Sequence, residues 1–249
     1  MTDSTETSTP ASARNNRRDS GPVRKRRIIG GFWFNLLAAF LVLGLIQGFV
    51  VKLYVIPSAS MENGLLPGDR VLVNRLAYGF GEPQRGDVIV FTASETWHPS
   101  VPNLDDPLTT TLKWVGSLVG VGPGTEHTLA KRIIATGGQQ VSCCDATGNL
   151  LVDGERLDEP YLYDDLPFTP GTLDCTTSPL SQRCFGPFTV PKEQYFVLGD
   201  HRSNSKDSIT RCRGQSATNN CRVATVLRTD LVGRVLTIVW PITRWSAVG

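Results

Sequence analysis

The chain has few of the residues that build metal and histidine-based sites. Its 249 residues include only three histidines, His98, His127 and His201, and its six cysteines contain no C-x-x-C pair. Structural zinc sites usually need such clustered ligands, so the sequence argues against a metal site. We also expect no other cofactor.

An excess of charge of either sign is missing too. Lysine and arginine number 25 against 23 aspartates and glutamates, so the net charge says little about partners. Seven basic residues are nevertheless concentrated in the first 27 positions, with no aromatic residue between them, which disfavours nucleic-acid binding. Basic residues before a first apolar run mark the cytoplasmic side of a membrane. We therefore expect residues 1–27 to form a disordered, basic cytoplasmic tail.

Charged residues are absent from positions 28–51. As a helix this run would reach about 36 Å, which exceeds the hydrocarbon thickness of about 30 Å, so we predict a transmembrane helix at 28–51. The small residues of Ser58–Ser60 leave a cleavable signal peptide as an alternative, but the apolar part of such peptides usually has only about 7–15 residues, and Pro57 lies in the candidate cleavage site. The prediction is a single-pass protein of the cell membrane with residues 52–249 outside the cytoplasm.

All six cysteines follow the apolar run, as expected in an oxidising compartment where disulfides persist. Cys143 and Cys144 are neighbours, and they need either a vicinal bond or partners further away. Two other pairs are favoured because they bracket short loops: Cys175 with Cys184, and Cys212 with Cys221.

Short apolar and β-branched runs, punctuated by Gly, Pro and Asp, recur after position 52. Such runs are typical of strands, so the sequence predicts a mainly β domain. Prolines and cysteines interrupt this rhythm near 93–124, 161–187 and 210–222, where we expect insertions. Strands are predicted at Arg70–Asn74, Asp87–Thr92, Lys131–Thr136, Gln140–Ser142, Gln194–Leu198 and Gly233–Trp240.

A serine-rich turn, Ile56–Met61, closely follows the apolar run. Ser60 is a candidate nucleophile, but a serine hydroxyl needs a base to take its proton. Lys131 is a candidate base, because its apolar neighbours would exclude water and so lower its pKa. His201 beside Asp200 offers the alternative of a Ser-His-Asp triad.

Three segments together resemble a known family: the serine turn, Leu129–Ile134 around Lys131, and Gly199–Ser208. In this order behind an apolar run they resemble bacterial type I signal peptidase, a family of membrane-bound Ser-Lys endopeptidases that remove signal peptides from exported proteins. The resemblance covers the chain from about Val50 to Trp245. Further matching segments are Gly86–Phe91 and Leu231–Val235, and features similar to the actinobacterial branch are Cys143-Cys144-Asp145, the cysteine-bracketed insertion after Ser208 and the Trp240-Pro241 ending.

The resemblance implies an antiparallel signal-peptidase-like β-domain and assigns roles to its site residues. Ser60 would be the acylated nucleophile and Lys131 the general base. The Ser58 hydroxyl would form the oxyanion hole with the Ser60 backbone amide, and Ser205 would orient the lysine. Four charged residues are expected to support the site: Asp200 with Arg132 as the favoured pair, and Asp207 with a partner that Ile209 leaves open, for which Arg202 is a candidate. Four residues would form substrate pockets or face the membrane: Ile56, Pro57, Met61 and Leu65.

Three positions depart from the family pattern. His201 stands where asparagine is usual, Glu62-Asn63-Gly64 replaces a segment that usually contains Pro-Thr, and Ile209 replaces an arginine. These departures keep open a catalytically silent paralogue that binds exported chains without cutting them. A dedicated peptidase for pilins or surface proteins is a further alternative, whereas the membrane anchor disfavours a self-cleaving repressor-type protein.

The activity implied by the resemblance is cleavage of preproteins after small residues, of the Ala-x-Ala type. The implied partners are preprotein signal peptides, the lipid bilayer and the secretion translocon. No nucleic acid is expected among them.

Overall fold

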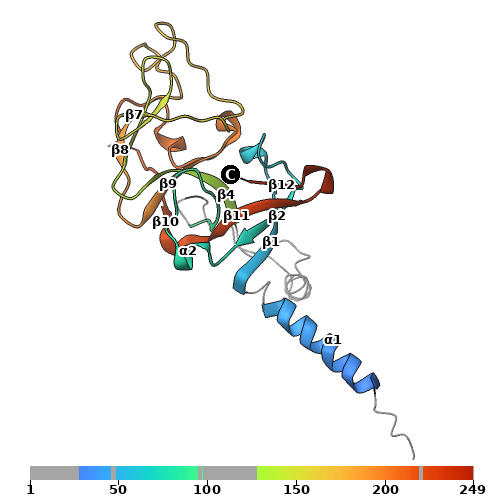
Figure 1. Ribbon diagram of the computed structural model, residues 1–249. Coiled ribbons are helices and arrows are strands. Elements are labelled where there is room, and N and C mark those ends of the chain that lie inside the picture. The colour runs from blue at the N-terminus through green and yellow to red at the C-terminus, as the bar shows by residue number, and fades with distance from the viewer. Residues whose placement is uncertain (1–27, 46–48, 95–96, 98–127, 219–220, 249) are drawn as a thin grey trace, which may run out of the picture. The chain divides into compact units, whose positions relative to one another are not determined.

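The computed structural model describes residues 28–45, 49–94, 97, 128–218 and 221–248 (Figure 1). The chain divides into two compact units, Met1–Phe40 and Leu41–Gly249. The predicted cytoplasmic tail at 1–27 lies outside the described residues, as does most of the predicted insertion near 93–124.

The first described element is the helix α1, Ile28–Leu45, whose residues 31–44 are exposed. Within the described ranges, no helix combines the length and the apolar character that crossing a bilayer requires. The transmembrane helix expected at 28–51 therefore stays a prediction.

An antiparallel sheet of eight strands dominates the described part of the second unit (Figure 1). Its centre, where β3 and β4 pair, is buried. β3 accordingly reads as a nearly continuous apolar run, whereas β4 has buried Lys131 and Arg132 between its apolar residues. The strands follow the order β1 (Val51–Val55), β2 (Arg70–Asn74), β11 (Leu231–Trp240), β3 (Val88–Thr92), β4 (Thr128–Thr136), β9 (Gln194–Leu198) and β10 (Val226–Leu227), with β12 (Ser246–Ala247) paired to β11.

A second antiparallel sheet has four strands, in the order β7 (Glu155–Arg156), β6 (Leu150–Val152), β5 (Gln140–Cys143) and β8 (Phe185–Thr189). The prediction of a mainly β fold is confirmed, and the strands expected at Arg70–Asn74 and Gln194–Leu198 have the predicted bounds. The remaining elements are the short helix α2 (Ala77–Phe80) and the 3-10 turns η2 (Ala59–Met61), η3 (Arg202–Asn204), η4 (Thr210–Cys212), η5 (Arg228–Asp230) and η6 (Ile242–Arg244).

An apolar cluster lies beneath the serine turn. Ile56, Met61 and Leu65 are at most 4% exposed and belong to it, together with Val71, Val73, Val88, Val90, Val235 and Ile238 of the large sheet. Ile56, Met61 and Leu65 were expected to form substrate pockets or to face the membrane. The membrane-facing alternative is wrong for these three, because strands cover them, and the substrate-pocket alternative stays a prediction. Pro57 is exposed.

Three disulfides connect the six cysteines. Cys143 bonds to its neighbour Cys144. The two loop-closing pairs are those expected from the sequence, Cys175–Cys184 and Cys212–Cys221. They close loops within the expected insertions at 161–187 and 210–222.

Candidate active site

The serine turn is held against the loop that leads into β2. Pro57 restricts Ile56 to extended backbone, and Ile56 exchanges backbone hydrogen bonds with Asp69 (2.9 Å) and Gly68 (2.8 Å). The chain then enters η2, where Ser60 is 7% exposed. A nucleophile is thus fixed on a short, well-bonded turn rather than on a free linker.

Lys131 lies in the middle of the large sheet, on β4, opposite Ile89 of β3. Its side chain is buried, and its Nζ donates a hydrogen bond of 2.6 Å to Ser60 Oγ. Burial lowers the pKa of the Lys131 ammonium below its usual range, while the carboxylates of Asp207 and Asp200 act in the opposite direction. When it is neutral, the Lys131 amine can accept the proton of Ser60 Oγ across this 2.6 Å hydrogen bond.

Ser58 is exposed at the start of η2, in extended backbone. Its Oγ is 3.4 Å from Ser60 Oγ. The two hydroxyls therefore border the same space, where an oxyanion that forms on attack by Ser60 would need a donor.

Ser205 donates its hydroxyl hydrogen bond to Asp207. Among the described residues, Ser205 and Lys131 are not hydrogen-bonded to each other, so the expected contact with the lysine is replaced by one with a neighbouring carboxylate. Gly199 makes this packing possible, since a Cβ there would overlap both the Ser205 side chain and the Ser60 carbonyl oxygen. Gly199 begins the segment that carries Ser205, but this close approach arises only in the folded chain and has no signal in the sequence.

Asp207 is bound from two sides. It accepts from the Gly199 backbone amide (2.8 Å) and forms an ion pair with Arg213 (2.9 Å). Arg202 instead pairs with Glu159 and donates to the Gly199 carbonyl oxygen (3.0 Å). The candidate partner Arg202 is therefore replaced by Arg213, which follows η4 and reaches the carboxylate from within an expected insertion.

Asp200 and Arg132 form a buried, bidentate ion pair. Arg132 Nε is 2.9 Å from Oδ1 of Asp200, and Nη2 is 2.8 Å from Oδ2. The guanidinium also donates to the Gly86 carbonyl oxygen (2.8 Å) and lies 4.0 Å from the centre of the Tyr161 ring. Burial raises the pKa of the Asp200 carboxyl, and Arg132 counteracts this. This pair joins the strand of Lys131 to the loop that carries Ser205.

His201 is engaged away from the nucleophile. Its Nδ1 is 2.7 Å from Glu62 Oε2, and its Nε2 is 3.6 Å from Asp164 Oδ2. Its backbone amide donates to the Ser60 carbonyl oxygen (3.2 Å). Within the described part of the chain, the imidazole has no hydrogen bond to Ser60 Oγ or to Asp200, so the geometry does not form the Ser-His-Asp triad.

Similarity to known proteins extends over most of the chain. The family model described as signal peptidase, peptidase S26, matches residues 21–240. The chain belongs to this family. The predictions of a serine peptidase, and of a signal peptidase in particular, are confirmed by this match and by the relatives.

Two similar members of the S26 signal peptidase family come from mycobacteria, in line with the predicted actinobacterial likeness. The probable signal peptidase I of Mycobacterium leprae (strain TN) is 37% identical over 233 residues, 87% of this chain and 79% of the relative. Signal peptidase I of Mycobacterium tuberculosis (strain CDC 1551 / Oshkosh) is 39% identical over 210 residues, 80% and 68% of the two chains. A solved signal peptidase I from Enterococcus faecalis V583 is 23% identical, with a TM-score of 0.32 over 63% of this chain and 98% of that chain.

Glu62 and His201, two positions that depart from the family pattern, contact each other across 139 residues of sequence. Their contact ties the nucleophile turn to the loop of Ser205. Replacing either residue, by Glu62→Gln or His201→Asn, is expected to lower kcat/KM roughly two- to tenfold, the range for one lost hydrogen bond. The kcat/KM of the double variant should be no lower than that of the less active single variant, because both changes remove the same contact.

A double-mutant cycle on signal-peptide cleavage by the full chain measures this coupling. Additive losses would show that the two residues act separately. If His201→Asn were inactive, the imidazole rather than the lysine would be the base.

Proposed function

We propose that the chain is a membrane-anchored Ser-Lys endopeptidase that removes signal peptides from exported preproteins, cutting after small residues. The observation that carries this proposal is the 2.6 Å contact between Lys131 Nζ and Ser60 Oγ in a site shielded from water. Serine supplies the nucleophile, and only a desolvated lysine is near enough to take its proton among the described residues.

The reaction follows from this geometry. Ser60 Oγ attacks the scissile carbonyl carbon while its proton moves to Lys131 Nζ, and the carbonyl oxygen becomes an oxyanion next to the Ser58 hydroxyl and the Ser60 amide. The Lys131 ammonium gives its proton to the leaving amine, and a serine ester remains. Water then gives a proton to Lys131 and attacks the ester carbonyl. The bond to Ser60 Oγ breaks, Lys131 returns its proton to that oxygen, and the new carboxyl terminus is released.

Two nearby carboxylates stabilise the charged form of Lys131 that this reaction requires. Asp207 and Asp200 favour the charged form of Lys131, so they stabilise the ammonium that exists between the two proton transfers. Burial acts in the opposite direction, because it lowers the pKa of Lys131 and so favours the neutral amine that acts as the base. The supporting roles of Arg132, through Asp200, and of Arg202, through the Gly199 carbonyl, are to hold the loop of Ser205 in place.

Specificity for small residues is attributed to the apolar surroundings of Ser60. Ile56, Met61 and Leu65 are packed into the core beneath the turn, and exposed Pro57 borders it. Because this core is packed, the surface above it would not open into a deep pocket, and it would admit alanine-sized side chains and exclude larger ones.

The topology proposed is a cytoplasmic segment at 1–27, a membrane span at 28–51 and an extracytoplasmic catalytic domain at 52–249. The uncharged run at 28–51 and the three disulfides that follow it support this orientation. Preproteins would reach the site from the secretion translocon, at the surface of the lipid bilayer.

Cleavage of a fluorogenic signal peptide with an Ala-x-Ala site tests the proposal. We expect the full chain in detergent to cut after the second alanine, with a rate that rises about tenfold per pH unit until the lowered pKa of Lys131 is passed, because only the neutral amine acts as the base. The same peptide with leucine at the cleavage position is the control and should resist.

Three results would contradict this proposal. A wild-type chain that is inert in detergent and in lipid towards several preproteins would favour the silent paralogue. A rate that does not change with pH would exclude a titrating lysine base. Cleavage confined to pilins or surface proteins would indicate the dedicated peptidase instead.

A further inference from the structure

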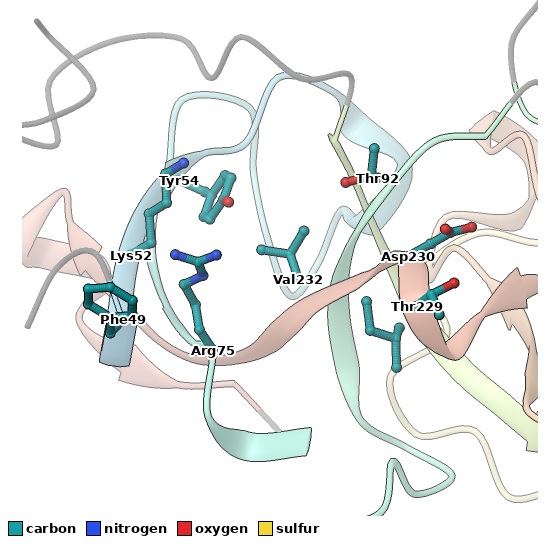
Figure 2. Close-up of a pocket in the computed structure, with 9 residues that line it drawn as sticks. Phe49, Lys52, Tyr54, Arg75, Thr92, Thr229, Asp230 and Val232 are labelled. Atoms are coloured by element: carbon teal, nitrogen blue, oxygen red, sulfur yellow. The ribbon is translucent and has the colours of Figure 1, made fainter. Parts of the chain in front are cut away.

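A cavity of about 470 Å³ lies at the end of the large sheet where the β1–β2 pair meets the start of β11. Its wall includes two cationic side chains, Lys52 and Arg75, and one acidic side chain, Asp230. Figure 2 shows Lys52, Tyr54 and Arg75 gathered on one side of the space, with Thr229 and Asp230 on the other side. The charge of this lining is net positive.

The antiparallel pairing of β1 and β2 brings the two cations together. Lys52 is opposite Val73 in the register of the two strands, and Arg75, directly after β2, donates its backbone amide to Val50 (2.9 Å). The Lys52 ammonium lies 5.2 Å from the centre of the Tyr54 ring, a contact that orients it and leaves its charge in place.

The position of this cavity in the chain indicates what it would meet. Lys52 directly follows the uncharged run at 28–51, and neighbouring Cα atoms are only about 3.8 Å apart. Phe49, also in the wall, belongs to that run. If the run spans the bilayer, as proposed above, then both cations stand at the depth of the lipid headgroups.

We propose that this cavity binds the phosphate of an anionic phospholipid. A phosphodiester matches the donors present, since Lys supplies a compact charge and Arg a planar fork for two oxygens. The volume is within the usual range of about 300–1,000 Å³ for ligand sites. Phe49 and Val232 offer apolar surface to the glycerol and acyl part of the same molecule.

A bound headgroup would set the height of the catalytic domain above the bilayer. Lys52 is on β1, the strand that ends at the serine turn, and Ser60 follows it by only eight residues. A lipid bound at one end of β1 would therefore set the height of Ser60 above the bilayer, and so its position relative to a signal peptide held in the membrane. This inference depends on the proposed membrane anchoring, but not on the identity of the catalytic base.

Native mass spectrometry of the full chain in detergent, with added phosphatidylglycerol, phosphatidylcholine or inorganic phosphate, tests the site. Wild type should retain phosphatidylglycerol in preference to phosphatidylcholine. The Lys52→Gln/Arg75→Gln variant should bind it about 25-fold more weakly, about fivefold for each cation. Arg70→Gln is the matched control, because Arg70 is an exposed cation at the opposite end of β2, and its affinity should equal that of wild type.

Three outcomes would overturn the lipid site. The first is equal binding by wild type and the double variant, and the second is equal retention of the two lipids. The third is displacement of the lipid by inorganic phosphate at similar concentration, which would make free phosphate the ligand.

Peptide cleavage in lipid-free detergent separates this inference from the proposed function. There the double variant should match wild type, whereas in vesicles containing phosphatidylglycerol only wild type should gain activity. A wild type that binds the lipid but cuts no peptide would leave the site standing and contradict the peptidase.

Discussion

Replacing Lys131 with methionine is expected to lower peptide cleavage by about 10⁴-fold or more at every pH, and Ser60→Ala should do the same. The two groups act as one unit through their 2.6 Å contact, so removing either one removes the step, and the double variant should lose no more than each single variant. Single-turnover cleavage of a signal peptide measures this loss.

Methionine is chosen because it keeps most of the length of the lysine in a site that is 3% exposed while removing the amine. The fold should therefore survive, which a thermal unfolding curve checks. Lys192→Met is the matched control, since Lys192 is exposed and its replacement should leave the rate unchanged. Residual cleavage by Lys131→Met that still rises with pH would show that another group is the base.

Asp200→Asn is expected to destabilise the fold by about 3–5 kcal/mol, because it leaves the Arg132 guanidinium buried without its counter-charge. Both side chains are at most 4% exposed, and two hydrogen bonds join them. Arg132→Met combined with Asp200→Asn should recover part of this loss, since no unpaired charge then remains. Denaturant unfolding of the full chain in detergent at neutral pH measures the free energies.

Glu82→Gln supplies the comparison for this second prediction. Glu82 pairs with Arg228 at the surface, where the two side chains are 76% and 29% exposed, and such pairs contribute at most about 1 kcal/mol. A loss in Asp200→Asn no larger than that in Glu82→Gln would contradict a structural role for the buried pair. Cleavage by Asp200→Asn should also fall, because the pair joins the Lys131 strand to the loop of Ser205.

Local features of this protein were predictable from the sequence because neighbouring residues decide them. The apolar runs at Arg70–Asn74 and Gln194–Leu198 became strands with the predicted bounds, since β-branched residues between turn-forming residues favour extended backbone whatever their partners. The two loop-closing disulfides needed only short separations along the chain. Ser60 and Lys131 were identified by motifs that each fit within a few residues.

Contacts between distant loops were decided only by the tertiary structure. Asp207 pairs with Arg213 rather than Arg202, and Ser205 binds Asp207, because the choice among several nearby arginines and acceptors depends on where each loop returns. The burial of Met61 and Leu65 likewise depends on strands from other parts of the chain. Charge and hydropathy fix which residues need partners, but the path of the backbone between them determines which partner each one finds.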